Sequence, residues 1–202
     1  MNFLVLVFSY LLGSVNFAYI TARIKGIDIS SSGSGNPGTS NVLRTLGKSS
    51  AAIVLLGDLL KGAIPIIFFS NDKYFLLYGL AAVLGHIYPL FYKFKGGKGV
   101  ATYLGVYIAA VLLNPNNSEL FDLQIFQILN IPTIALFYFV IFKTTRVSAI
   151  ASLSTVTTTI ALLIFVNNEI ENILILLILL FLIFLKHSEN IKRLAEGKEN
   201  KF

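Results

Sequence analysis

Ser32-Gly33-Ser34-Gly35-Asn36-Pro37-Gly38-Thr39-Ser40-Asn41-Val42-Leu43-Arg44 is the one long polar, glycine-rich segment in a chain otherwise dominated by apolar runs. Glycines allow the backbone to adopt positive φ angles, so that successive N–H groups can turn toward one point. Side-chain donors are added by Ser34, Thr39, Ser40, Asn41 and Arg44. The pattern indicates an anion site, most naturally for a phosphate. Taken alone, it is at least as typical of a flexible loop.

A second glycine-rich turn, Gly96-Gly97-Lys98-Gly99, supports the functional interpretation. It follows Lys93 and Lys95, carries a basic side chain of its own and leads directly into an apolar run. Backbone N–H groups at the start of a helix attract anions. The two segments together predict a ligand with two anionic ends.

The composition places the chain in a membrane. Of its 202 residues, 55% are hydrophobic and only 13% are charged, and the mean hydropathy is +0.78, well outside the range of soluble domains. The net charge of +6 comes from basic residues in short loops, which is a topology signal and not a sign of nucleic-acid binding. The absence of cysteine excludes disulfides, thiolate metal sites and cysteine nucleophiles.

Apolar runs predict an all-α integral membrane protein, organised as a single membrane domain over residues 1–202. No basic residue precedes the first run, whereas Arg23 and Lys25 follow it, which is the reverse of the charge order in a signal peptide. Seven spans are expected, at about residues 2–22, 50–70, 74–92, 100–113, 126–142, 148–166 and 170–185.

The basic residues predict the orientation of these spans. With seven spans, the loops on the side of the 32–44 segment carry fourteen of the sixteen basic residues. Because positive charge accumulates on the cytoplasmic side, we expect the N-terminus outside and the C-terminus inside, with all the polar, glycine-rich segments on the cytoplasmic face. The fourteen are Arg23, Lys25, Arg44, Lys48, Lys93, Lys95, Lys98, Lys143, Arg146, Lys186, Lys192, Arg193, Lys198 and Lys201.

Polar residues within or at the ends of the spans are further candidates. Asp58 and Lys61 are spaced to pair on one helix face, either as a structural ion pair or as part of the site. His86, at the cytoplasmic end of the third span, suits either a structural hydrogen bond or a catalytic base. His187 and Asn190 share one face if the last helix continues, where they could bind a phosphate or hydroxyl or merely cap the helix.

Arg146 lies just before Ser148 at the start of a predicted helix. The helix dipole disfavours a cation there unless an anion is shared, so the position indicates ligand binding.

Several familiar chemistries are excluded by their missing motifs. Gly47-Lys48-Ser49 lacks the earlier glycine of a P-loop, which would stand at position 42. A nucleophile elbow needs a glycine two residues before its serine, and Ser32 occupies that place before Ser34. Two histidines, far apart, do not form a metal-binding pattern. Phe91 stands where the His-x-x-x-x-Asp pair of another acyltransferase class would place an aspartate after His86. An enzyme built from these residues must work by binding anions and orienting reactants.

Four stretches of the chain carry a family resemblance. They are the first glycine segment extended through Thr45-Leu46-Gly47-Lys48, the second extended through Val100-Ala101-Thr102, Gly85-His86-Ile87-Tyr88-Pro89, and His187-Ser188-Glu189-Asn190-Ile191-Lys192-Arg193-Leu194. Together they resemble the PlsY family of bacterial acyl-phosphate:glycerol-3-phosphate acyltransferases. The resemblance covers essentially the whole chain. It implies a seven-helix bundle and transfer of an acyl group from acyl phosphate to the 1-hydroxyl of glycerol 3-phosphate, giving lysophosphatidic acid and phosphate. It also implies a multi-pass protein of the bacterial plasma (inner) membrane with its active site facing the cytoplasm. The family's third motif corresponds to Thr145-Arg146-Val147-Ser148, but its serine is shifted here, leaving Ser148 and Ser152 as alternatives.

The resemblance and the charges together predict the site. Catalytic roles are expected for Lys98, Arg44 and His187. Substrate-binding roles are expected for Ser34, Gly35, Asn36, Gly38, Thr39, Asn41, His86, Gly96, Gly97, Gly99, Thr102, Arg146, Ser148, Ser152 and Asn190. The expected partners are acyl phosphate, glycerol 3-phosphate and the lipid bilayer, with no cofactor, metal or nucleic acid. The alternative is a small transporter or flippase for a phosphorylated solute, although such a protein is expected to bind near mid-membrane.

Overall fold

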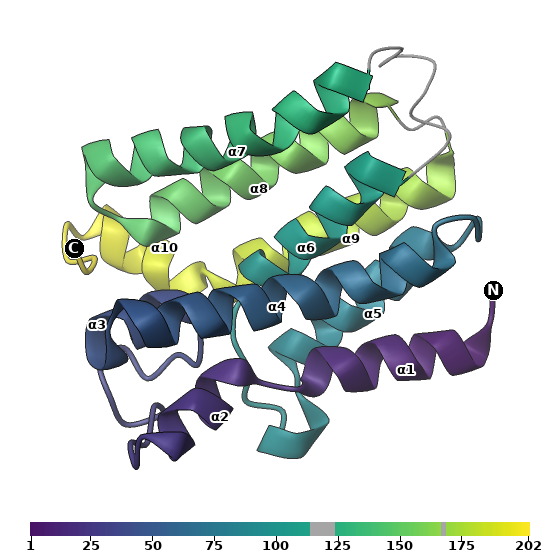
Figure 1. Cartoon of the computed structure of the whole chain (residues 1–202). Coiled ribbons are helices and arrows are strands. Elements are labelled where there is room, and N and C mark those ends of the chain that lie inside the picture. The colour runs from purple at the N-terminus through teal and green to yellow at the C-terminus, as the bar shows by residue number, and fades with distance from the viewer. Residues whose placement is uncertain (114–123, 167–168) are drawn as a thin grey trace. The chain divides into compact units, whose positions relative to one another are not determined.

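The computed structural model describes residues 1–113, 124–166 and 169–202, and its regular elements there are all helical (Figure 1). They are α1 (Phe3–Ser14), α2 (Phe17–Ile24), α3 (Thr39–Leu46), α4 (Lys48–Phe69), α5 (Phe75–Ile87), the 3-10 turn η1 (Leu90–Tyr92), α6 (Val100–Leu113), α7 (Gln124–Thr145), α8 (Ser148–Val166), α9 (Ile170–Lys186) and α10 (Ser188–Ala195). The contacts divide the chain into two compact units, Met1–Ala109 and Ala110–Phe202, and each is described by itself.

The first apolar run is two helices, not the single continuous helix that the sequence predicts. Val15 is extended, and the Asn16 side chain accepts hydrogen bonds from the N–H groups of Ala18 (3.0 Å) and Tyr19 (3.1 Å). An asparagine that caps a new helix in this way replaces the bonds of a continuous ladder. α1 and α2 together still pass as one candidate membrane span, Phe3–Ile24.

Glycines bring the helices of the first unit close together. A β carbon on Gly13 of α1 would overlap the Ala82 carbonyl of α5, and one on Gly85 of α5 would overlap the Tyr10 carbonyl of α1. α4 and α6 approach in the same way, because a β carbon on Gly62 would overlap the Thr102 carbonyl. Small residues of this kind permit dense packing where lipid removes the hydrophobic drive between helices.

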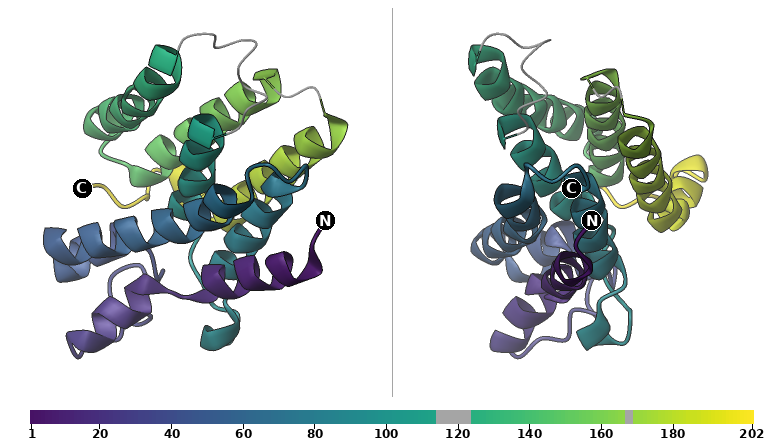
Figure 2. Two further views of the ribbon diagram at one scale, coloured as in Figure 1. Left: turned by 45° about the vertical axis from the view of Figure 1, so that its right-hand side comes forward. Right: turned by 90° about the vertical axis from the view of Figure 1, so that its right-hand side faces the viewer.

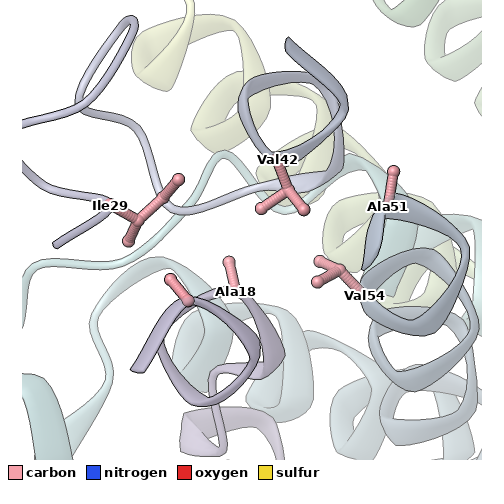
Figure 3. Packing of buried hydrophobic residues seen from close by; sticks show 6 residues of the cluster. Ala18, Ile29, Val42, Ala51 and Val54 are labelled. Atoms are coloured by element: carbon pink, nitrogen blue, oxygen red, sulfur yellow. The ribbon is translucent and has the colours of Figure 1, made fainter. Parts of the chain in front are cut away.

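An apolar cluster lies beneath the first glycine segment (Figure 3). Ala18 of α2, Val42 of α3 and Val54 of α4 are fully buried in it, together with Ile29 from the connection between α2 and α3. The cluster therefore anchors both ends of the glycine segment to two membrane helices.

In the second unit, α7 and α8 lie side by side, and α9 packs on α8 (Figures 1 and 2). α9 and α10 meet at a 56° bend, so the condition for a shared face of His187 and Asn190, a helix that continues through His187, is not met. The C-terminal residue Phe202 donates its N–H to the Arg146 carbonyl (2.9 Å) and sets its ring edge-on against Phe142, with 5.2 Å between centroids.

All seven predicted spans coincide with helices of the described residues. Among the described residues, four helical segments are long and apolar enough to cross a membrane, or five if the bent pair of α9 and α10 is one span. α6 is shorter: its 14 residues extend about 21 Å, less than the roughly 30 Å of a hydrocarbon core. Exposed apolar side chains, such as Leu56 and Phe68 on α4, suit contact with lipid.

Candidate active site

The first glycine segment is a turn followed by a helix, and not a loop throughout. α3 begins at Thr39, so Thr39, Asn41 and Arg44 lie on a helix. Gly38 precedes it in an extended conformation and provides no side-chain cap. The first N–H groups of α3 therefore point toward the preceding turn, which is the arrangement that attracts an anion.

Asn41 closes the glycine turn from inside. Its side chain accepts a hydrogen bond from the Ser34 N–H (2.9 Å) and donates one to the Ser32 carbonyl (2.9 Å). Gly33 has φ +59°, and a β carbon on it would overlap the Asn41 side-chain oxygen. Asn41 is almost fully buried. It shapes the turn, while the Ser34 residue is exposed.

The approach to this turn is organised by Asp28. Its carboxylate accepts hydrogen bonds from the N–H (2.9 Å) and hydroxyl (2.7 Å) of Ser30, and these bonds lower the pKa of Asp28. The hydroxyls of Ser31 and Ser32 donate to the Asp28 carbonyl. The hydroxyls of these three serines thus serve the local fold.

The second glycine turn is reached through a tight backbone path after α5. Lys93 and Phe94 have φ of 52° and 58°, a left-handed conformation that is uncommon outside glycine. Gly99 has φ +86° and leads into α6 at Val100. Lys98 is half-buried, and Lys95 is exposed. Lys98 therefore stands immediately before the N-terminus of an apolar helix.

The two glycine segments meet at Gly97. Its N–H donates to the His86 carbonyl (3.2 Å). A β carbon on Gly97 would overlap the His86 ring at Nε2 and would lie 3.1 Å from the Pro37 carbonyl oxygen. Only glycine fits between the two. The structure thus brings the first glycine segment together with two motifs that follow it much later in the chain, Gly85–Pro89 and the second glycine turn.

Two predicted threonines stand near helix N-termini. Thr39 is the first residue of α3, and Thr102 is the third residue of α6. Within residues 1–113, 124–166 and 169–202, neither buried hydroxyl has a hydrogen-bond partner. A buried hydroxyl without a partner is costly, and both are therefore suited to a ligand oxygen.

The predicted pairing of Asp58 with Lys61 is confirmed: Lys61 Nζ lies 2.8 Å from Asp58 Oδ1. Two neighbours were missed. Asp58 Oδ1 lies 3.5 Å from His86 Nδ1 on α5, and Lys61 also donates to the Val15 carbonyl (2.7 Å) at the break between α1 and α2. No local pattern signals either contact, because both join separate helices.

In the second unit, Arg146 forms the connection between α7 and α8. It is exposed, with φ +59°, and its N–H donates to the Phe142 carbonyl (2.8 Å). Ser148 is the first residue of α8 and half-buried. Ser152, one turn later, is buried and hydrogen-bonded to Tyr138 of α7. Ser148 and Arg146 thus stand at the helix N-terminus, whereas the Ser152 hydroxyl is engaged between the two helices.

His187 lies at the bend between α9 and α10. Its Nδ1 lies 2.7 Å from the Ile183 carbonyl oxygen, and because a carbonyl only accepts, Nδ1 carries the proton. In the neutral ring Nε2 is then the acceptor nitrogen. Asn190 donates to Glu199 (2.8 Å), which also accepts from Arg193 (2.9 Å). Sequence reasoning missed Glu199, whose place in the tail gives no sign of this contact.

No metal site is evident in the part of the chain that the structure describes, because no three His, Cys, Asp or Glu side chains gather there. The chemistry offered by the two units is that of backbone N–H groups, hydroxyls, imidazoles and the cations Arg44, Lys98 and Arg146. Such groups bind and orient phosphates.

Fold and site together define an integral membrane protein with glycine-rich segments suited to anionic substrates. Comparison with known proteins identifies the family: residues 3–197 match the model of the family described as glycerol-3-phosphate acyltransferase. The chain belongs to this family.

Its relatives cover nearly the same length. The glycerol-3-phosphate acyltransferase of Aquifex aeolicus is 41% identical over 97% of this chain and 96% of its own. That of Wolbachia pipientis is 40% identical over 100% and 98%. The fold is similar to the crystal structure of PlsY (YgiH), an integral membrane glycerol 3-phosphate acyltransferase, in its glycerol 3-phosphate form, with a TM-score of 0.85, 35% identity and coverage of 98% of this chain and 94% of that one. The lysophosphatidic acid form matches with a TM-score of 0.82.

Proposed function

We propose that this protein transfers an acyl group from acyl phosphate to the 1-hydroxyl of glycerol 3-phosphate in phospholipid biosynthesis. The observation that carries the proposal is the meeting of the two glycine segments at Gly97, in a chain whose relatives are glycerol-3-phosphate acyltransferases. Both reactants bear a phosphate. Two anion-binding segments that touch would hold two phosphates close together.

The reaction suits these groups. Attack of the 1-hydroxyl on the acyl carbon forms the ester bond and breaks the bond to the phosphate oxygen, while inorganic phosphate leaves. Acyl phosphate is a mixed anhydride with a good leaving group, so alignment and charge stabilisation matter more than a strong nucleophile. Arg44 and Lys98 would hold the two phosphates and stabilise the departing charge. The hydroxyl proton passes to a substrate phosphate oxygen or to a histidine.

The roles of the other candidates follow from their contacts. Ser34 and the backbone of residues 35–39 would line the first phosphate site, with Asn41 holding their shape. The 96–99 turn and Thr102 would line the second. His187 would position the glycerol moiety, and Asn190 would keep the bend at His187 in place through Glu199. Of the two serines in the third motif, we assign Ser148 to the substrate, since Ser152 is engaged with Tyr138.

One assay tests the function against its alternatives. Purified protein in detergent, given acyl phosphate and labelled glycerol 3-phosphate, is expected to form labelled lysophosphatidic acid and inorganic phosphate. Detergent removes any compartment, so a transporter or a purely structural subunit would form no product. A preparation that is monodisperse and binds glycerol 3-phosphate but makes no lysophosphatidic acid would contradict the proposal.

We further propose a single membrane domain with seven spans, with α6 and α7 completing the set, in a bacterial plasma membrane and with the site on the cytoplasmic side. A reporter active only in the cytoplasm should work when fused after Phe202 and fail when inserted in the loop at about residues 114–122, which lies outside the described residues. The expectation comes from the bias of positive charge toward one side. The reverse pattern would contradict it.

The proton acceptor is tested through the two histidines. If a substrate phosphate takes the proton, His86→Gln and His187→Gln should each weaken substrate binding. Neither variant should change the ionisations that the kcat–pH profile shows near the ordinary histidine pKa of about 6.5. Full pH profiles of both variants check this. Loss of that ionisation and most of kcat in His187→Gln alone would instead make His187 the base.

A further inference from the structure

Asp58 and Lys61 form a buried polar cluster with His86, and the chemistry above assigns no step to this ion pair. Their exposed fractions are 2%, 1% and 4%. Asp58 Oδ1 lies 2.8 Å from Lys61 Nζ and 3.5 Å from His86 Nδ1. The cluster joins α4 to α5 and, through the bond from Lys61 to the Val15 carbonyl, to the break between α1 and α2.

Stability alone is a weak reason for such a cluster. Removing two charges from water is so costly that apolar replacements of a buried ion pair are often neutral or stabilising by about 1–4 kcal/mol. What apolar side chains cannot do is favour one orientation of an imidazole ring by placing a charge next to one of its nitrogens. The geometry around His86 shows what such an orientation would serve.

The His86 ring connects the cluster to the second glycine turn. Its Nδ1 edge faces Asp58, and its Nε2 edge is covered by Gly97, where a β carbon would overlap the ring. The main chain of His86 accepts the Gly97 N–H (3.2 Å). Lys98 is the next residue. A rotation of the imidazole would therefore displace the turn that presents Lys98.

We propose that Asp58 is a positioning residue of the reaction: paired with Lys61, it fixes the His86 ring and thereby the 96–99 turn. Lys61 pairs with the buried carboxylate and ties it to the broken first span. His86 is on this account a strut between the ion pair and the turn. The inference rests on the phosphate-binding role proposed above for that turn.

The test compares Asp58→Asn/Lys61→Met with Tyr78→Phe. The double variant removes both charges at nearly constant volume, so that no buried ion is left without its partner. Tyr78 is a matched control because it is fully buried on the same helix as His86, yet its hydroxyl bonds to Asp72 and to the Asn2 N–H at the other end of that helix. Both variants lose polar links between helices, and only one touches the turn.

Positioning predicts that the double variant raises KM for at least one substrate about tenfold while kcat changes less than about threefold. Tyr78→Phe should lower thermal stability in detergent and leave both KM values unchanged. Equal KM values in the double variant and the wild type would overturn the proposal. Lys98→Met distinguishes the positioning role of Asp58 from the phosphate-binding role of the turn. If Lys98→Met loses activity and the double variant does not, only the positioning role of Asp58 is contradicted. If the Lys98→Met enzyme stays active, the phosphate-binding role of the turn is contradicted.

A spectroscopic measurement on the wild type tests the orientation of the His86 ring directly. The chain has only two histidines, so ¹⁵N-histidine labelling gives two imidazole signals, assigned with His187→Gln. In the wild type, His86 should carry a hydrogen-bonded proton on Nδ1, and this signal should shift in Asp58→Asn/Lys61→Met while that of His187 stays in place. A wild-type His86 protonated on Nε2 alone could not donate to Asp58, and this result would overturn the proposal whether or not the double variant can be purified.

Discussion

Replacing Lys98 by methionine is expected to lower kcat/KM by at least about a hundredfold, equivalent to roughly 3 kcal/mol of transition-state stabilisation. Methionine keeps most of the apolar stem and removes the charge. Lys98 stands between Gly97 and Gly99, and α6 begins directly after Gly99, at Val100. The ammonium and the helix N-terminus therefore act on the same anion.

Lys95→Met is the matched control for this substitution. Lys95 belongs to the same basic stretch but is exposed before the turn, and its loss should cost less than about tenfold, as expected of a screened surface charge. If Lys98 served only to set the membrane topology, both variants would show similar small losses. Retention of more than about a third of wild-type turnover by a monodisperse Lys98→Met protein would contradict the assignment.

Gly97→Ala should be nearly as damaging, although it changes no charge. The new β carbon would overlap the His86 ring and press on the Pro37 carbonyl oxygen, and the ring is held by Asp58 on its other edge. The turn must therefore move away from the first glycine segment. A displacement of about 1 Å in a group that positions a reactant can cost about a hundredfold in rate.

Gly26→Ala separates this local effect from the general cost of replacing a glycine. Gly26 follows α2 with φ +68°, and no atom lies within 4 Å of the β-carbon position. The left-handed conformation should cost alanine about 1 kcal/mol of stability, with turnover close to that of the wild type. Parallel melting curves and initial rates in detergent check both variants. A Gly97→Ala enzyme within about threefold of the wild-type rate would show that the two segments need not touch.

Short-range patterns in the sequence were sufficient for the helices. An apolar run long enough to bury its own backbone hydrogen bonds in lipid must be helical, which is why the seven predicted segments all coincide with helices. The turns of the glycine segments also follow from short-range patterns. The positive φ angles at positions 33, 35 and 99 are a local property of glycine. The break at Asn16 is also a local event: the apolar run over residues 2–22 predicted one span, whereas the Asn16 side chain caps a new helix within it.

Contacts between distant segments could be decided only by the tertiary structure. Nothing near Asp58 in the chain reveals that His86 is its neighbour, and nothing near Gly97 reveals that it lies between His86 and Pro37. Asn41 has a polar side chain of the kind that binds ligands. In the structure, however, both of its polar side-chain atoms bond to the backbone of the glycine turn. Hydropathy and glycine content are properties of residues that are neighbours in the chain. The contacts above depend instead on which helices cross. The crossing of these helices is set by the close packing of Gly13, Gly62 and Gly85 against the backbones that face them.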